Sequence, residues 1–260
     1  MENNLYSNLA LIRERSPLIL NITNLVTMDF VANGLLAIGA SPVMSNSEQE
    51  LEELIKIASC VVINIGTLDH NQIIMFEKAV QICGKLNKKV ILDPVGSGAT
   101  SYRTNTALKL LSMGHISIIK GNASEIMSLS GDNVNTKGVD SSNSTDDAVD
   151  AASRLAKKYN ICVVVSGKKD LIINEKSHQY CDLGHKMMSQ VTGMGCLLSA
   201  IVGAFHTVCD DAFEASVDAV NFFGLTGKIA SENPTTFGTA SFRSNFIDTL
   251  YNLRASKNAI

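Results

Sequence analysis

The sequence predicts an α/β fold in which helices cover both faces of a central, mostly parallel sheet. Two observations lead to this prediction. Short apolar runs rich in β-branched residues alternate with amphipathic helical patterns, and the part of the chain after residue 195 is almost entirely helical in pattern. The apolar runs are continuous rather than alternating, which is typical of strands that are buried on both faces of a parallel sheet.

The apolar runs give the expected strands in chain order. These are Leu18–Ile22, Cys60–Ile65, Lys89–Asp93, Ile116–Lys120 and Ile161–Ser166, followed by a meander of Leu171–Asn174 and Gln179–Leu183. Most of these strands are separated by stretches long enough for a helix, as parallel pairing requires.

Two further segments are assigned from their local patterns. Apolar residues recur at helical spacing along Ser47–Ala58, which predicts an amphipathic helix. The polar stretch Val139–Asp147 predicts a surface loop, in which Ser144 or Thr145 would cap a helix over Asp146–Tyr159.

Composition limits the class of protein. With 260 residues, 45% of them hydrophobic, the chain can bury a full core, and we expect a single domain over residues 1–260. A net charge of -3 and the absence of Trp argue against nucleic-acid binding. No apolar run reaches the ~18 residues of a membrane span, and the N-terminus lacks a signal-peptide pattern. The six cysteines form no CxxC pair, so we expect a reduced, cytoplasmic protein.

The segment Val191–Cys196 is the most informative part of the chain. It reads Val-Thr-Gly-Met-Gly-Cys and runs directly into a long apolar helical pattern. Gly193 and Gly195 would let the backbone take positive φ and approach a ligand, while the first N–H groups of the helix converge on it. This pattern predicts an anion hole with Cys196 at its mouth.

Polar residues also follow the expected strands at the ends where a parallel sheet binds ligands. Asp93 ends one strand before a Pro/Gly turn, Lys120 ends the next, and Ser166 ends a third. Each has a simpler explanation: Asp-Pro is common in turns, and the Ser166 segment suits a hairpin turn. Asn122 and Glu125 resemble a helix capping box, but capping leaves Lys120 unexplained.

These residues would all meet at one edge of the sheet, which suits phosphoryl transfer from a nucleotide. Carboxylates bind Mg²⁺, while a lysine and helix-end amides bind phosphate. The familiar nucleotide signatures are missing, because no GxxxxGK[ST] occurs and Gly193 and Gly195 lack the third glycine of a dinucleotide fingerprint. The five histidines share no metal-ligand spacing.

These motifs resemble those of the ribokinase-like kinases, and within that group those of the hydroxyethylthiazole kinases of thiamine salvage. The Thr-Gly-Met-Gly-Cys sequence matches their anion-hole signature, with Cys in place of the usual final Asp. Further matching segments occur in order over residues 17–250, at Ile22–Asn24, Ala32–Met44, Asn64–Thr67, Leu92–Gly96, Lys120–Glu125 and Lys137–Asp140. The sequence departs from the pattern at Ser166, where Thr is frequent, and at Asn233–Phe242, which replaces a shorter Gly-Pro-Gly segment.

The resemblance implies a ribokinase-like fold and a kinase that uses ATP and Mg²⁺ to phosphorylate 4-methyl-5-(2-hydroxyethyl)thiazole. It also implies a homotrimer with active sites between subunits. Carried over by motif, it implies a thiazole pocket at Asn24, Met44 and Gly193, ATP contacts at Lys120, Ser166 and Gly195, Mg²⁺ positions at Asp93 and Glu125, and Cys196 in place of the catalytic Asp.

Cys196 leaves the activity open to alternatives. A free thiol with pKa ~8.5 is only a few per cent thiolate at neutral pH, so we expect a weak base or hydroxyl partner and a slow kinase; Cys196 could instead simply pack the helix. A related kinase for a pyrimidine or pyridoxal-type alcohol would be favoured by Asp at position 196. A thiazole- or nucleotide-binding protein without turnover is a third hypothesis, although it would not need Asp93, Lys120 and Glu125. A cysteine hydrolase lacks a His–acid pair at a strand end.

Overall fold

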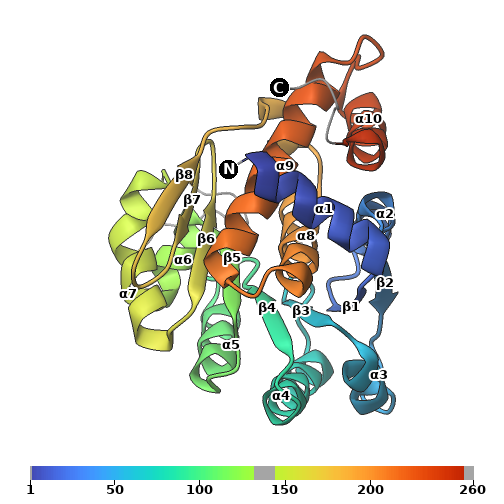
Figure 1. Cartoon of the computed structure of the whole chain (residues 1–260). Coiled ribbons are helices and arrows are strands. Elements are labelled where there is room, and N and C mark those ends of the chain that lie inside the picture. The colour runs from blue at the N-terminus through green and yellow to red at the C-terminus, as the bar shows by residue number, and fades with distance from the viewer. Residues whose placement is uncertain (1, 132–143, 255–260) are drawn as a thin grey trace.

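A single eight-stranded sheet, with strand order β2-β1-β3-β4-β5-β6-β7-β8, organises the molecule. The structure is a computed structural model that describes residues 2–131 and 144–254 (Figure 1). The strands are β1 (Leu18–Ile22), β2 (Ser41–Met44), β3 (Cys60–Asn64), β4 (Lys89–Asp93), β5 (Ile118–Asn122), β6 (Cys162–Ser166), β7 (Asp170–Ile173) and β8 (His178–Cys181). The first six pair in parallel, and β7 and β8 add an antiparallel meander.

Helices from the two ends of the chain cover one face of the sheet. These are α1 (Glu2–Arg15), α2 (Met28–Ile38), α8 (Met194–Val208), α9 (Ala212–Glu232) and α10 (Thr239–Asn252). Helix α8 packs against β3 and β4 near the middle of the sheet, and α9 packs against β6, β7 and β8 (Figure 1). Fully buried Phe205 and Phe222 join α8 to α9 within this core.

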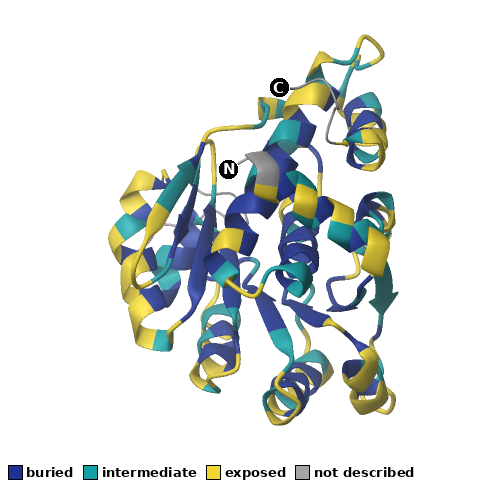
Figure 2. Cartoon of the chain, viewed as in Figure 1, coloured by how far each residue is buried: buried dark blue, intermediate teal, exposed yellow. Residues whose placement is uncertain are grey.

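The other face carries the crossover helices that parallel strands require. They are α3 (Leu51–Ile57), α4 (His70–Lys85), α5 (Ser101–Ser112), α6 (Ala123–Leu129) and α7 (Val149–Tyr159), with short 3-10 turns η1 (Asp146–Ala148) and η2 (Lys186–Gln190). Along β3, Cys60 and Val62 face the α8 layer while Val61 and Ile63 face this second layer. The central strands are therefore buried from both sides, whereas the edge strands β2 and β8 are only partly buried (Figure 2).

The predicted fold class is confirmed, and every predicted strand is present within two residues of its expected ends. Strand β2 was not predicted. It has only four residues and is half-buried throughout, since it lies at the edge of the sheet. The edge position also tolerates Pro42, which has no backbone N–H to donate. Helix α3 begins at Leu51, later than the predicted Ser47.

The predicted helix Asp146–Tyr159 is confirmed, with η1 forming its first turn. Ser144 makes the cap: its Oγ accepts from the Asp147 N–H at 3.3 Å and the Asp147 carboxylate accepts from the Ser144 N–H at 2.9 Å. Thr145 makes no such bond. Residues 139–143 of the predicted loop and the matching segment Lys137–Asp140 lie outside the described residues.

Two general expectations can be compared with the structure. All six cysteines lie within the described ranges, and none forms a disulfide. Within residues 2–131 and 144–254, no helix has the length and apolar character needed to cross a bilayer.

Candidate active site

The N-terminus of α8 has the backbone geometry expected of the predicted anion hole. Gly193 precedes the helix with φ of 92°, a conformation that strongly favours glycine. A Cβ at this position would lie 3.0 Å from Thr27 Cγ2 and 3.1 Å from Phe30, so the turn has no room for a side chain. The first helical bond runs from Leu197 N–H to the Gly193 carbonyl, which leaves the N–H groups of the first turn without an acceptor inside the helix.

Gly195 serves a different purpose from the one predicted. It lies inside the first turn of α8 and does not have positive φ, so the prediction of positive φ at Gly195 is wrong. Its missing side chain makes room for Lys120: a Cβ on Gly195 would lie 2.9 Å from Lys120 Nζ. The lysine ammonium therefore lies directly against the positive end of a helix, an arrangement that an anion between them would stabilise.

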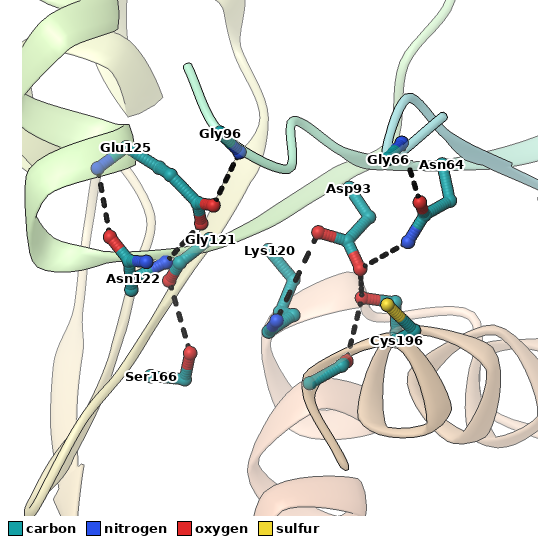
Figure 3. Close-up of polar contacts among 12 residues, drawn as sticks. Asn64, Gly66, Asp93, Gly96, Lys120, Gly121, Asn122, Glu125, Ser166 and Cys196 are labelled. Atoms are coloured by element: carbon teal, nitrogen blue, oxygen red, sulfur yellow. Dashed lines mark hydrogen bonds and ion pairs between the residues drawn. The ribbon is translucent and has the colours of Figure 1, made fainter. Parts of the chain in front are cut away.

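Asp93 ends β4, whereas Lys120 lies two residues before the end of the adjacent strand β5, which runs further than predicted. Both side chains are buried. Lys120 Nζ lies 4.0 Å from Asp93 Oδ1 (Figure 3). Burial lowers the pKa of Lys120, but the acidic groups around it, Asp93 first and then Glu125, Cys196 and Asp170, together raise it by more, so the ammonium stays charged. Burial raises the pKa of Asp93, against the lowering effects of Lys120, Ser199 and Asn64.

The two oxygens of Asp93 have different surroundings. Oδ2 accepts hydrogen bonds from Asn64 Nδ2 at 2.9 Å and Ser199 Oγ at 2.7 Å. Oδ1 is buried and has no hydrogen-bond partner among the residues that the structure describes. An unpartnered carboxylate oxygen in a buried site is costly unless a ligand satisfies it. Asp93 thus offers one oxygen to whatever binds beside Lys120.

Glu125 lies in the first turn of α6, where the predicted capping box is present. Its N–H donates to Asn122 Oδ1 at 2.9 Å, and its Oε2 accepts from the Asn122 N–H at 2.8 Å. Oε1 accepts from the Gly96 N–H at 2.7 Å, so the carboxylate also holds the loop that follows β4 (Figure 3). Burial raises the pKa of Glu125 to about 7, with Lys120 acting in the opposite direction.

Cys196 and Asn24 meet on the other side of Asp93. Asn24 Nδ2 lies 3.4 Å from Cys196 Sγ, and Asn24 Oδ1 accepts from the N–H groups of Val26 and Thr27 at 3.1 Å. Burial, followed by Asp93, raises the pKa of the Cys196 thiol, and the opposing effect of Lys120 is smaller. The thiol is therefore largely protonated at neutral pH, so little thiolate is present to accept a proton.

Ser166 and Met44 lie at the two flanks of this edge. Ser166 ends β6 next to Asn122 of β5, and its Oγ donates to the Gly121 carbonyl at 3.3 Å. Met44 ends the edge strand β2 beside Asn21 of β1 and is half-buried. The structure thus places the nine predicted site residues along one edge of the sheet. They lie on or just after β1, β2, β4, β5 and β6, in the first turn of α6, and at the start of α8. The role that the resemblance assigns to each stays a prediction.

Three residues of this edge were not predicted. Asn64 ends β3 and Ser199 lies on α8, and both donate to Asp93. Arg103 on α5 donates to the carbonyls of Ile65, Gly66 and Val95 at 2.8–2.9 Å, which ties together the loops after β3 and β4. Only the position of Asn64 at a strand end gave a signal in the sequence.

Comparison with known proteins identifies the family. The model of the hydroxyethylthiazole kinase family matches residues 9–256. A hydroxyethylthiazole kinase of Chlamydia felis is 46% identical over 253 residues, covering 96% of this chain and 95% of the relative.

Solved structures agree with this match. The hydroxyethylthiazole kinase of Pyrococcus horikoshii OT3 has a TM-score of 0.88 at 37% identity, covering 97% of this chain and 94% of that chain. A ribokinase-like superfamily protein from Enterococcus faecalis shares the fold, with a TM-score of 0.63 at 14% identity over 94% of this chain and 88% of its own. The chain belongs to the hydroxyethylthiazole kinase family and has its ribokinase-like α/β fold.

Proposed function

We propose that this protein transfers the terminal phosphoryl group of ATP to the hydroxyethyl group of 4-methyl-5-(2-hydroxyethyl)thiazole, a step of thiamine salvage. Membership of the family supports the reaction and the substrates. The observation that carries the chemistry is the convergence of Lys120, Asp93 and the N-terminus of α8 on one point of the sheet edge. Binding a neutral thiazole alone would need no such arrangement.

The phosphoryl group is stabilised mainly by charge and by position. In phosphoryl transfer the protein neutralises and orients the transferring group rather than bonding to it covalently. The Lys120 ammonium and the first N–H groups of α8 point at one place and would hold the phosphate oxygens there. Gly195 keeps that place open, and Ser166, at the end of β6, would contact ATP on the neighbouring side.

The residues present fit a Mg²⁺ ion. Mg²⁺ is usually held by one or two carboxylates together with phosphate oxygens and water. The buried, unpartnered Oδ1 of Asp93 would supply one such oxygen. Both oxygens of Glu125 already accept backbone N–H groups, so this second carboxylate would act on the ion through its charge rather than as a direct ligand. No group of three or more His, Cys, Asp or Glu side chains that could hold a metal occurs in the described residues, as expected if ATP completes the shell. When bound, the ion would neutralise phosphate charge.

The thiazole would occupy the side of the site that carries Asn24, Met44 and Gly193. Cys196 would then face its hydroxyl group. Because burial and Asp93 raise the pKa of this thiol, Cys196 acts as a hydrogen-bonding partner that positions the hydroxyl rather than as a strong base. Loss of a general base typically reduces a rate ~10²–10⁴-fold, so we expect slow turnover.

The assembly that we propose is a homotrimer of single-domain subunits in the cytoplasm, with the active sites between subunits. Leu25 and Val26 directly follow Asn24 in the chain and are 62% and 69% exposed. Exposed apolar residues beside a site are suited to contact with another subunit. Sedimentation velocity of the full chain tests this state, and a monomer at assay concentration would contradict it.

One experiment tests the function directly. The purified protein is incubated with ATP, MgCl₂ and the thiazole, and the phosphate ester is detected by mass spectrometry, with the Lys120→Met variant as control. We expect ester from the wild type only. No ester from a protein that still binds ATP and thiazole would favour a binding protein without turnover. A higher kcat/KM for pyridoxal or a hydroxymethylpyrimidine would favour a related kinase.

A further inference from the structure

Asn64 joins the two halves of the site through one buried side-chain amide. Its Nδ2 donates to Asp93 Oδ2 at 2.9 Å (Figure 3). Its Oδ1 accepts from Asn24 Nδ2 at 2.9 Å. Asn24 in turn reaches Cys196 Sγ at 3.4 Å. Asn64 is only 2% exposed, so water cannot replace these bonds easily.

Backbone donors fix the orientation of both amides. Oδ1 of Asn64 also accepts from the Gly66 N–H at 3.0 Å, and a backbone N–H can only donate. Its Nδ2 must therefore face Asp93. Oδ1 of Asn24 accepts from the N–H groups of Val26 and Thr27, so its Nδ2 must face Asn64 and Cys196. The two assignments are independent and they agree, which removes the usual ambiguity between oxygen and nitrogen in an amide.

The surrounding backbone holds this arrangement in place. Gly66 packs against the Asn24 amide so closely that a Cβ on Gly66 would lie 2.8 Å from Asn24 Cβ. The carbonyl of Gly66 accepts from Arg103 Nη2 at 2.9 Å. The donor that orients Asn64 therefore has little freedom to move.

We infer that Asn64 is a positioning residue that couples the acceptor side of the site to the phosphoryl side. It holds Asp93 so that Oδ1 stays directed at Lys120, and it holds Asn24 against Cys196. The inference rests on the proposed function, because it takes Asn24 as part of the thiazole pocket. It adds a residue to which the sequence resemblance gave no role.

Ser199 offers a matched control. Its Oγ donates to the same Asp93 oxygen at 2.7 Å and it is fully buried, yet no hydrogen bond to Asn24 is recorded for it among the described residues. Asn64→Ala and Ser199→Ala each remove one donor from Asp93. Only Asn64→Ala also releases Asn24.

The experiment compares kcat, the KM for thiazole and the KM for ATP in both variants, with thiazole affinity measured by calorimetry in the absence of ATP. We expect kcat to fall about tenfold or more in both, since one hydrogen bond to a charged group is lost. We expect the thiazole KM and Kd to rise about tenfold in Asn64→Ala only. Asn245→Ala, which removes a buried amide from α10, should change none of these constants.

Asn64→Asp keeps the inference testable if Asn64→Ala does not fold. This variant has nearly the same shape and retains oxygens to accept from Asn24 and Gly66. It replaces the amide donor to Asp93 with a carboxyl oxygen, so that the two acids either repel each other or share a proton. Its thiazole Kd should stay within about threefold of wild type while kcat falls about tenfold or more. Equal thiazole affinities in Asn64→Ala and Ser199→Ala, or a weakened thiazole Kd in Asn64→Asp, would overturn the inference. A wild-type protein that neither binds thiazole nor forms ester would instead overturn the proposed function.

Discussion

The ends of β4 and β5 carry two buried acids that have opposite surroundings. Asp93 at the end of β4 receives only side-chain donors, all on Oδ2, and leaves Oδ1 without a partner among the described residues. Glu125, three residues after β5, accepts backbone N–H groups on both oxygens, from Gly96 and from Asn122. The sequence had suggested the same Mg²⁺ role for both.

The difference separates a ligand-facing acid from a framework acid. Hydrogen bonds from backbone N–H groups tie Glu125 to the loop after β4 and to the start of α6, so removing it would loosen the edge of the sheet. Asp93 is held from one side and open on the other. Substitutions at the two positions should therefore affect turnover and stability in different proportions.

The largest effect is expected for Asp93→Asn. Asn has no negative charge and carries an NH₂ group in place of one carboxylate oxygen. Lys120 therefore loses its nearest carboxylate, and the phosphoryl-binding part of the site loses a negatively charged ligand. We expect kcat to fall roughly 10³-fold, similar to the loss of a principal electrostatic group in other active sites. Steady-state kinetics with saturating ATP measures this. A variant within tenfold of wild type would show that Oδ1 is not used.

Glu125→Gln tests the framework role. One oxygen can still accept, but the new NH₂ group faces a backbone N–H, so a buried bond is lost and two donors oppose each other. This should lower the free energy of unfolding by about 1–3 kcal/mol, with a smaller loss of kcat than in Asp93→Asn. Urea unfolding at pH 8 provides the measurement. Unchanged stability combined with a larger loss of kcat would reverse the assignment of the two acids.

Cys196→Asp adds a carboxylate near Asp93 and so tests how this part of the site responds to a further negative charge. The new carboxylate is ionised at neutral pH and can accept a proton, whereas the thiol is largely protonated. Lys120 and the start of α8 can stabilise its charge. We expect kcat to be retained or raised. Cys196→Ala is the control, which keeps the helix but removes both functions. Complete loss of turnover in folded Cys196→Asp would reject a hydrogen-bonding or base role for this position.

The smallest effect, a change in how stability depends on pH, is expected for a substitution of Asp170 at the start of β7. The Asp170 carboxylate accepts a hydrogen bond from the Gly167 N–H at 2.8 Å. Burial raises its pKa from 3.8 to about 7. Because the folded state then holds its proton more tightly, Asp170 contributes stability at low pH that is lost as pH rises between these values.

Asp170→Asn removes this titration. The stability of the wild type relative to the variant should therefore be greater at pH 5 than at pH 8, by urea unfolding at both values. The opposite trend would mean that the carboxylate, not the acid, is the stabilising form.

Much of the site follows from the sequence because its residues lie at strand ends, where local pattern and topology agree. The capping box of Asn122 and Glu125 and the positive φ of Gly193 depend on neighbours within a few residues, so they could be predicted. Ser199 could not, because its bond to Asp93 spans 106 positions and a single serine within the apolar run of α8 gives no local sign of a partner. Strand β2 was hidden by Pro42 and by its edge position.

Asn24 and Cys196 are hydrogen-bonded although 172 positions separate them in the chain. Most of the strands and their crossover helices lie between them in the chain. Contacts between such distant residues form slowly, because the entropy of closing the loop is lost before the contact contributes any stabilising free energy. A refolding chain can therefore regain native helix content well before it regains a site. Recovery of turnover after dilution from urea reports on the completed sheet, and no fragment that ends before α8 contains the thiol.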